Sequence, residues 1–193
     1  MFTVGIVMIG EFKYYKIIGE WLLSHGYDIG EGLGLPRGSY EDRGSPSSRF
    51  DKAGVKNLGR KHIEIATVEI KNRGITEDTI KQAIRYHDFS HKTYLASPHR
   101  PSRNIADKIE NSGLGFLWIN PRKAAVEEVI EPRLNNPKKD TMIYWLNNHL
   151  CIYRCRICGV FVRKDKAREH SFKVMKISEN EFETTLLCRN CKE

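Results

Sequence analysis

The segment Ile63–Gly74 constrains the fold of this chain most strongly. Side chains alternate between the two faces of a strand, and here apolar residues fall on both faces. One face carries Ala66, Val68 and Ile70, and the other carries Ile65, Thr67, Glu69 and Lys71. A strand that is apolar on both sides belongs in the middle of a covered sheet. The sequence therefore predicts a central strand with an acid and a base together at its C-terminal end.

Glu69 and Lys71 have two interpretations. They can be the ordinary polar end of an amphipathic strand, held by cross-strand ion pairs. They can also be chemically active, because charged groups at the end of a buried strand must be hydrated, paired or used. The rest of the chain has to decide between the two.

Composition limits the classes of protein to which this chain can belong. A length of 193 residues allows one main domain and a small appended module. The net charge of +8 and the pI near 9.3 favour a polyanionic partner such as nucleic acid. The longest apolar runs, near Val4–Ile9 and Leu114–Ile119, are too short to span a bilayer, and the N-terminus lacks the pattern of a secretory signal. We expect a soluble, cytoplasmic protein that does not enter membranes.

All five cysteines lie near the C-terminal end of the chain. Cys155-x-x-Cys158 and Cys188-x-x-Cys191 stand at the two ends of one short segment, which is typical of metal ligands rather than of a disulfide framework. The fifth, Cys151, is expected to pack within the preceding helix. His170 is an alternative ligand, although the neighbouring basic stretch 163–168 makes a surface position the expectation. That stretch can track phosphates or be a solvated charged turn.

Strand and helix signals alternate through the first two thirds of the chain and predict a mixed or parallel α/β sheet. Thr76 is the expected N-cap of one helix, and Asp140 is the expected N-cap of a later helix that contains Trp145. Helices are predicted at 12–26, 76–86, 102–111 and 141–150, and strands at 50–56, 63–71, 93–97, 114–119 and 125–130.

Asp51 reaches the face of Glu69 and Lys71 only if the turn after its strand contains an odd number of residues, with Gly59 in the left-handed conformation. The three-residue turn Asn57–Gly59 leaves Asp51 some way along the ladder, so a bulge or a longer loop is required. Asp42 is the alternative acid. It lies in a long loop, 28–49, whose Arg37, Tyr40, Arg43 and Arg49 can contact phosphates or form plain surface.

Taken in order, these residues resemble the PD-(D/E)XK nuclease superfamily, in its branch similar to RecB nucleases and Holliday-junction resolvases. The family core is a helix, three antiparallel strands, a helix and a further strand, and the chain resembles it from about Phe12 to Ile119. The resemblance matches Glu20 to the acid of the first helix, Asp51 to the motif aspartate, and Glu69 with Lys71 to the acid and lysine of the central strand. Gln82 and Tyr86 match the signature of the following helix. Phe50 stands where the motif has proline, and the loop before Asp51 is long.

This resemblance implies a restriction-endonuclease-like mixed sheet flanked by helices, and catalysis by Glu20, Asp51, Glu69, Lys71, Gln82 and Tyr86. Asp51 and Glu69 are hard oxygen ligands suited to Mg²⁺ or Mn²⁺, which supplies an activated water and neutralises charge on the phosphate. Lys71 would orient that water or stabilise the same charge. Gln82 and Tyr86 would hold the substrate or Lys71, or would simply pack against the sheet.

The cysteine module resembles a zinc ribbon, in which Cys155, Cys158, Cys188 and Cys191 would bind a structural Zn²⁺. An iron–sulfur cluster is the rival, but related nucleases split such cysteines around the nuclease domain. We expect a nuclease-like domain at 1–136, a linker helix at 137–152 and the ribbon at 153–193.

The expected function is metal-dependent hydrolysis of nucleic acid, with DNA favoured over RNA and the ribbon aiding the binding of substrate or partner. A homodimer is compatible with the resemblance. The alternatives are a non-catalytic nucleic-acid-binding protein on a nuclease fold and a protein-interaction module.

Overall fold

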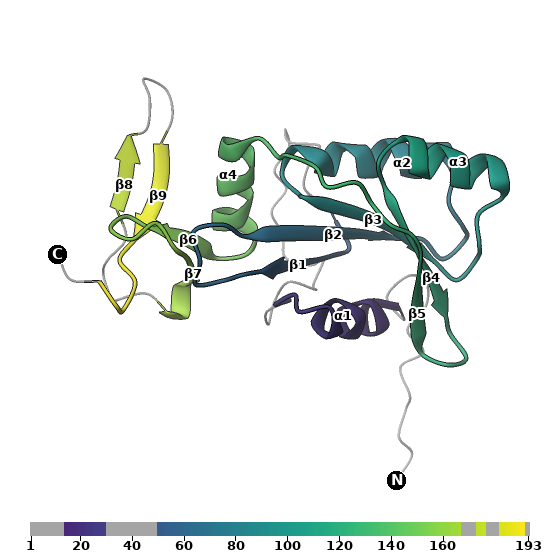
Figure 1. The fold of residues 1–193 in the computed structure, drawn as a ribbon, viewed down its shortest axis with the longest axis horizontal. Helices are drawn as coiled ribbons and strands as arrows, with labels where there is room; N and C mark the ends of the chain where they lie inside the picture. The colour runs from purple at the N-terminus through teal and green to yellow at the C-terminus, as the bar shows by residue number, and fades with distance from the viewer. Residues whose placement is uncertain (1–13, 30–49, 167–172, 177–181, 192–193) are drawn as a thin grey trace, which may run out of the picture.

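A five-stranded mixed sheet forms the centre of the molecule (Figure 1). The computed structural model describes residues 14–29, 50–166, 173–176 and 182–191. The strands lie in the order β1-β2-β3-β4-β5. Their bounds are Lys52–Lys56 for β1, Glu64–Ile70 for β2, Lys92–Ser97 for β3, Gly115–Asn120 for β4 and Ala125–Ile130 for β5. The predicted mixed α/β sheet and its central strand are confirmed.

Strand directions follow from the connections. The β1 and β2 strands pair antiparallel, β2, β3 and β4 run parallel through helical crossovers, and β5 returns antiparallel beside β4. Residues 57–63 connect β1 to β2, an odd number that includes Gly59 at φ +85°. The connection is longer than the simple three-residue turn. This length sets the register at Lys56 opposite Glu64 and Lys52 opposite Val68.

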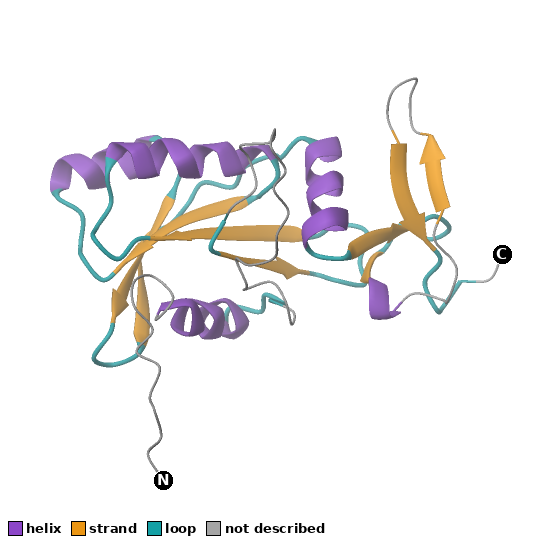
Figure 2. Ribbon diagram, turned by 180° about the vertical axis from the view of Figure 1, so that it is seen from behind, coloured by secondary structure: helices purple, strands orange, loops and turns teal. Residues whose placement is uncertain are grey.

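Helices cover both faces of the sheet (Figure 2). Helix α1 (Tyr15–Ser24) packs its aromatic and aliphatic stripe on the face formed by Ala66, Val68 and Ile70. The other face carries α2 (Glu77–Ile84), which continues as the 3₁₀ turn Arg85–Asp88, together with α3 (Arg103–Asn111) and α4 (Lys139–His149). The two-sided burial of β2 is therefore satisfied as the sequence predicts.

A second, four-stranded sheet forms the C-terminal module, in the order β7-β6-β9-β8. Its strands are β6 (Ile152–Cys155), β7 (Phe161–Arg163), β8 (Lys173–Lys176) and β9 (Phe182–Leu186), and the 3₁₀ turn Lys164–Lys166 follows β7. The module shares a core with the main sheet, because Ile152 and Phe161 pack in one cluster with Ile63, Ile65 and Trp145. Helix α4 thus packs against the sheet and the module alike.

The structure agrees with the predicted cap of α2 but differs from the prediction at both ends of α4. Thr76 caps α2 as expected, since its Oγ1 accepts from the backbone N–H of Thr79 at 3.3 Å. The assignment of Asp140 as a cap is wrong, because α4 starts two residues earlier than predicted, with Lys138 at the N-cap and Asp140 in the first turn. Cys151 does not pack in the helix. It follows α4 as an exposed residue at φ +52°.

Within the described ranges, no helix is long and apolar enough to cross a membrane. Several residues considered in the sequence, among them Asp42, Arg37, Tyr40, Arg43, Arg49 and His170, lie outside the described residues.

Candidate active site and metal centre

Asp51 and Glu69 meet at the C-terminal end of β2. Lys52 pairs with Val68, so the next residue outward on β1, Asp51, comes beside Glu69 and Ile70. Asp51 does not continue the strand. Its Oδ2 instead accepts the backbone N–H of Ile70 at 2.7 Å. The hydrogen bond anchors the carboxylate just before the start of β1, beside the C-terminal end of β2.

Glu69 is a buried carboxylate with two strong partners. Only 2% of its surface is exposed. Its Oε1 accepts from Lys71 Nζ at 2.6 Å, and its Oε2 accepts from the Tyr86 hydroxyl at 2.6 Å. Gln82 Nε2 in turn donates to the Tyr86 oxygen at 3.3 Å. The predicted pair Gln82 and Tyr86 therefore acts on Glu69, and Tyr86 joins α2 and its 3₁₀ extension to the acid.

Electrostatics distinguish this acid from an ordinary surface glutamate. Burial raises the pKa of Glu69, and the negative charge of Asp51 raises it further, while the hydrogen bonds from Lys71 and Tyr86 act in the opposite direction. Burial and the neighbouring Glu69 also raise the pKa of Tyr86 above its usual value, so Tyr86 remains a hydrogen-bond donor. The two carboxylates repel each other, which a bound cation would relieve.

The structure adds Tyr15, which sequence reasoning missed. Its hydroxyl donates to Asp51 Oδ1 at 2.5 Å, so both oxygens of that acid are held. Tyr15 is the first residue of α1 and is buried on its sheet-facing side. A polar-tipped aromatic residue on the buried stripe was the available signal, because a buried tyrosine hydroxyl requires a partner.

Glu20 is not brought to this cluster. It lies on the solvent side of α1 with 58% of its side chain exposed, where its Oε1 is 3.8 Å from Lys16 Nζ. Among the described contacts, no hydrogen bond or ion pair links it to Asp51 or Glu69. The structure thus unites Asp51, Glu69, Lys71, Gln82 and Tyr86 and leaves Glu20 apart.

The carboxylate oxygens of Asp51 and Glu69 are the type of ligand that a hard divalent cation prefers. Asp51 and Glu69 supply carboxylate oxygens, and each oxygen keeps a second lone pair beyond its present hydrogen bond. In the part of the chain that is described, these two acids are not joined by a third acid or histidine within ligand distance. Since Mg²⁺ takes about six oxygens, most positions would fall to water and phosphate oxygens.

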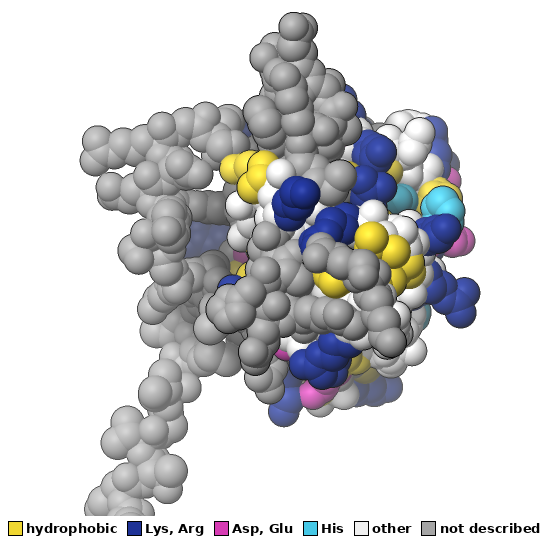
Figure 3. Space-filling view, turned by 90° about the vertical axis from the view of Figure 1, so that its left-hand side faces the viewer, with side chains coloured by type: hydrophobic (Ala, Val, Ile, Leu, Met, Phe, Trp, Pro, Cys, Tyr) yellow, Lys and Arg dark blue, Asp and Glu magenta, His cyan; other side chains and the backbone are white. Residues whose placement is uncertain are grey.

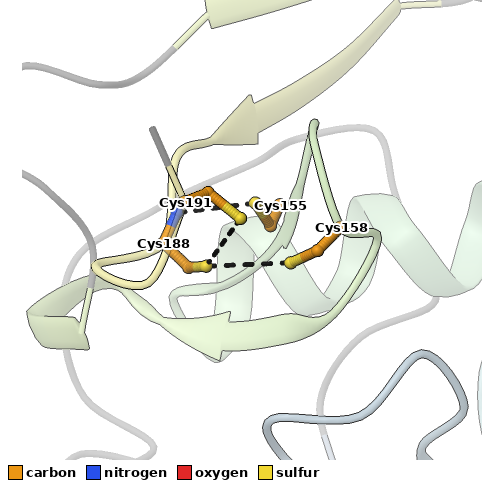
Figure 4. Close-up of side chains that lie close together, drawn as sticks. All are labelled: Cys155, Cys158, Cys188 and Cys191. Atoms are coloured by element: carbon orange, nitrogen blue, oxygen red, sulfur yellow. Dashed lines mark hydrogen bonds between the residues drawn. The ribbon is translucent and has the colours of Figure 1, made fainter. Parts of the chain in front are cut away.

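Four cysteines form a separate centre in the C-terminal module (Figure 4). Their Sγ atoms lie within 4.8 Å of one another. Cys188 Sγ is 3.7 Å from that of Cys158 and 3.6 Å from that of Cys191. A tetrahedral Zn²⁺ with Zn–S bonds of about 2.3 Å requires sulfurs about 3.8 Å apart, so the geometry fits a structural zinc ion. The predicted grouping of four cysteine ligands is confirmed.

Thiol electrostatics support the same assignment. Burial alone would raise the pKa of Cys155, but hydrogen bonds from backbone N–H groups, including that of Cys188, lower it to about 6. Hydrogen bonding to the other cysteines raises the pKa of Cys191 to about 12, and burial raises that of Cys158. Without a cation these pKa shifts favour a thiolate at Cys155 and protons on Cys158 and Cys191. A divalent metal would stabilise the remaining thiolates.

Comparisons with known proteins give little further information. No protein-family model matches the chain, and no curated protein matches it. A solved structure, of a protein of unknown function from Silicibacter pomeroyi, is similar with a TM-score of 0.49 and 13% identity over 75% of this chain and 86% of that one. At that level the similarity carries no argument, so the functional proposal has to come from the site itself.

Proposed function

We propose that this protein is a metal-dependent nuclease of the PD-(D/E)XK type, with DNA the favoured substrate. The observation that carries the proposal is the convergence of Asp51 and Glu69, with Lys71, at the end of the buried central strand. Two mutually repelling acids and one ammonium at a strand end cost stability unless they are put to use. Around them the described elements run α1, β1, β2, α2 and β3, which matches the family order except that two antiparallel strands, not three, lie between the helices.

Each residue has a distinct task in this proposal. Asp51 and Glu69 would hold Mg²⁺ or Mn²⁺, which, when bound, would activate water and neutralise charge on the scissile phosphate. The ammonium of Lys71, whose side chain is 25% exposed, would face a phosphate oxygen or the attacking water. Tyr15 and Tyr86 would hold the two carboxylates in orientation, and Gln82 would hold Tyr86.

One observation favours a second candidate, a nucleic-acid-binding protein without catalytic activity. The ammonium of Lys71 already neutralises Glu69 at 2.6 Å, and the Tyr86 hydroxyl occupies the other oxygen. A closed ion pair of this kind is also what a purely structural site would contain. The two candidates share the basic surface and differ in whether a cation enters between the acids.

A cleavage assay separates the two. Purified protein is incubated with single-stranded, double-stranded and branched DNA and with RNA, with and without Mg²⁺ or Mn²⁺. We expect cation-dependent cleavage that falls at least about 100-fold in Glu69→Gln and Lys71→Met. Binding without cleavage of any substrate would select the second candidate.

Glu64→Gln is the matched control. Glu64 lies on the same strand and its Oε1 also faces a lysine, Lys56, at 3.9 Å, but at the other end of β2. Loss of an acid–lysine pair there should leave cleavage within a few-fold of wild type. Equal losses in Glu69→Gln and Glu64→Gln would mean that the strand is sensitive as a whole, and would remove the case for a catalytic Glu69.

A further inference from the structure

A basic cleft opens where the main sheet meets the C-terminal module. It encloses about 610 Å³ and lies between the β1–β2 connection, helix α4 and the first cysteine knuckle. Lys61, Lys139, Arg154 and Arg156 line it together with His62, and none of the lining residues is an acid. Figure 3 looks onto this end of the molecule, where Lys and Arg side chains gather around apolar ones. Four cations converging on one concave surface focus a positive potential.

The cleft is built from backbone contacts that hold its walls together. Gly59 N donates to Phe161 O at 2.7 Å, and Phe161 N donates to Arg60 O at 3.0 Å, so the β1–β2 connection is bonded to strand β7. The Lys61 side chain lies over Gly159, where a Cβ would be 3.9 Å from its Cγ. Met142 and Ile143 of α4 add an apolar wall. The cations are therefore placed on fixed segments, which lowers the ordering cost of binding.

Strand β2 connects the cleft to the site around Glu69. Lys61 and His62 lie three and two residues before the start of this strand at Glu64, and Glu69 lies near its far end. Seven residues at about 3.3 Å each separate His62 from Glu69 by about 23 Å, the length of about seven base pairs. Helix α4, which walls the cleft, packs on the same face of the sheet as Tyr86, the partner of Glu69. A single nucleic acid can therefore reach both.

We propose that this cleft binds the phosphate backbone of nucleic acid on one side of the scissile bond, about seven base pairs from it. The placement relative to a scissile bond rests on the proposed nuclease function, whereas binding in the cleft does not. Arg and Lys side chains recognise phosphate oxygens, and an apolar wall accommodates sugar or base edges. The cysteine module then serves as the wall that carries Arg154 and Arg156 and sets their distance from Lys61.

Salt-dependent binding tests the cleft. Fluorescence anisotropy of a labelled duplex, without added Mg²⁺ or Mn²⁺, is measured over a range of salt concentrations. The cleft variant is the triple substitution Lys61→Ala, Lys139→Ala and Arg156→Ala. The control variant is Lys81→Ala, Arg122→Ala and Lys123→Ala. It also removes three positive charges, but from exposed positions on α2 and the β4–β5 turn. Each lost phosphate contact makes the slope of log K against log salt less steep by about 0.9, so we expect a change of about 2 to 3 only in the cleft variant.

Three outcomes would overturn the proposal: unchanged affinity and slope in the cleft variant, an equal loss in the control, or equally tight and equally cleft-dependent binding of poly-glutamate. The first two would remove the cleft as a nucleic-acid site, and the third would make it a general polyanion site. Circular dichroism and zinc content verify that each variant is folded.

A second measurement tests the distance. If the wild type cleaves DNA, kcat/KM should rise as the flank of a duplex grows to about seven base pairs and then level off, and the cleft variant should not show the rise. A rise that persists in the variant would contradict the placement. If no substrate is cleaved, the nuclease proposal fails, while the anisotropy result still decides whether the cleft binds nucleic acid.

Discussion

Replacing Lys71 with methionine should destabilise the fold at neutral pH and much less in mild acid. The substitution removes the ammonium that donates to Glu69 at 2.6 Å and leaves a carboxylate that is 2% exposed beside Asp51. Breaking a buried pair in this way costs about 3–5 kcal/mol. The cost has a ceiling, because Glu69 can take up a proton instead. From an ordinary glutamate pKa of about 4.3, protonation costs about 4 kcal/mol at about pH 7.5 and about 2 kcal/mol at about pH 5.5.

Proton linkage sets the direction in which the stability of the Lys71→Met variant changes with pH. The pKa of Glu69 in the folded state already lies above its ordinary value, and loss of Lys71 raises it further. The folded state then binds more protons than the unfolded state, so stability is present at low pH and is lost as pH rises through the folded-state pKa. Urea denaturation of wild type and variant at about pH 7.5 and 5.5 measures the difference. We expect the destabilisation to shrink by about 2 kcal/mol between the two.

The double variant Glu69→Gln with Lys71→Met controls for packing. It has no charge to leave unpaired, so its stability relative to wild type should show a much weaker dependence on pH. In the single variant, Mg²⁺ or Mn²⁺ should restore stability by about 2.7 kcal/mol at a hundredfold excess over Kd. The bound cation would neutralise the Glu69 carboxylate that the loss of Lys71 leaves unpaired. A destabilisation that is equal at both pH values would refute the reasoning about Glu69.

Three further results are expected. Tyr15→Phe should weaken Mn²⁺ binding, measured by calorimetry, by about 10- to 100-fold, because Asp51 loses the donor at Oδ1; unchanged affinity would show that this contact does not orient the acid. Cys188→Ser should reduce the zinc content from one per chain and lower Tm, and full zinc occupancy would exclude the four-cysteine centre. Gly115→Ala should cost about 1–3 kcal/mol, because the new Cβ would lie 2.6 Å from the ring of Tyr94, and wild-type stability in urea would contradict that packing.

Patterns that depend on neighbouring residues allowed much of this structure to be predicted. Alternation along Ile63–Ile70 is enough to place a strand between two helical layers, and two Cys-x-x-Cys pairs are enough to predict one centre. The sequence states the condition for Asp51 to share the face of Glu69, an odd number of connecting residues, but does not fix that number; the seven residues 57–63 meet the condition.

Features that depend on tertiary packing were not accessible in the same way. Glu20 has the spacing of a helix acid near the sheet, but the rotation of α1 turns it to solvent, and that rotation is set by the burial of Ile18, Trp21 and Leu22. The bond from Tyr15 to Asp51 joins residues 36 positions apart, so a buried tyrosine indicates that its hydroxyl needs a partner but not which residue supplies it. Cys151 illustrates the limit at helix ends, where one residue in the left-handed region exposes a side chain that periodicity would bury.

The shared core explains why the cysteine module cannot be regarded as a tethered appendage. Ile152 and Phe161 of the module pack in the same cluster as Ile63 and Ile65 of the main sheet, and Arg163 of β7 holds Asp28, beside β1, through two hydrogen bonds of 2.5 and 3.1 Å. A metal that orders the knuckles therefore also orders the segment just before β2. Since that segment carries Lys61, the geometry of the basic cleft depends on the cysteine centre, and the same strand continues to Glu69. The two proposed sites are thus connected by one buried strand, and if the cleft binds nucleic acid as proposed, this connection would make the C-terminal module part of what positions it.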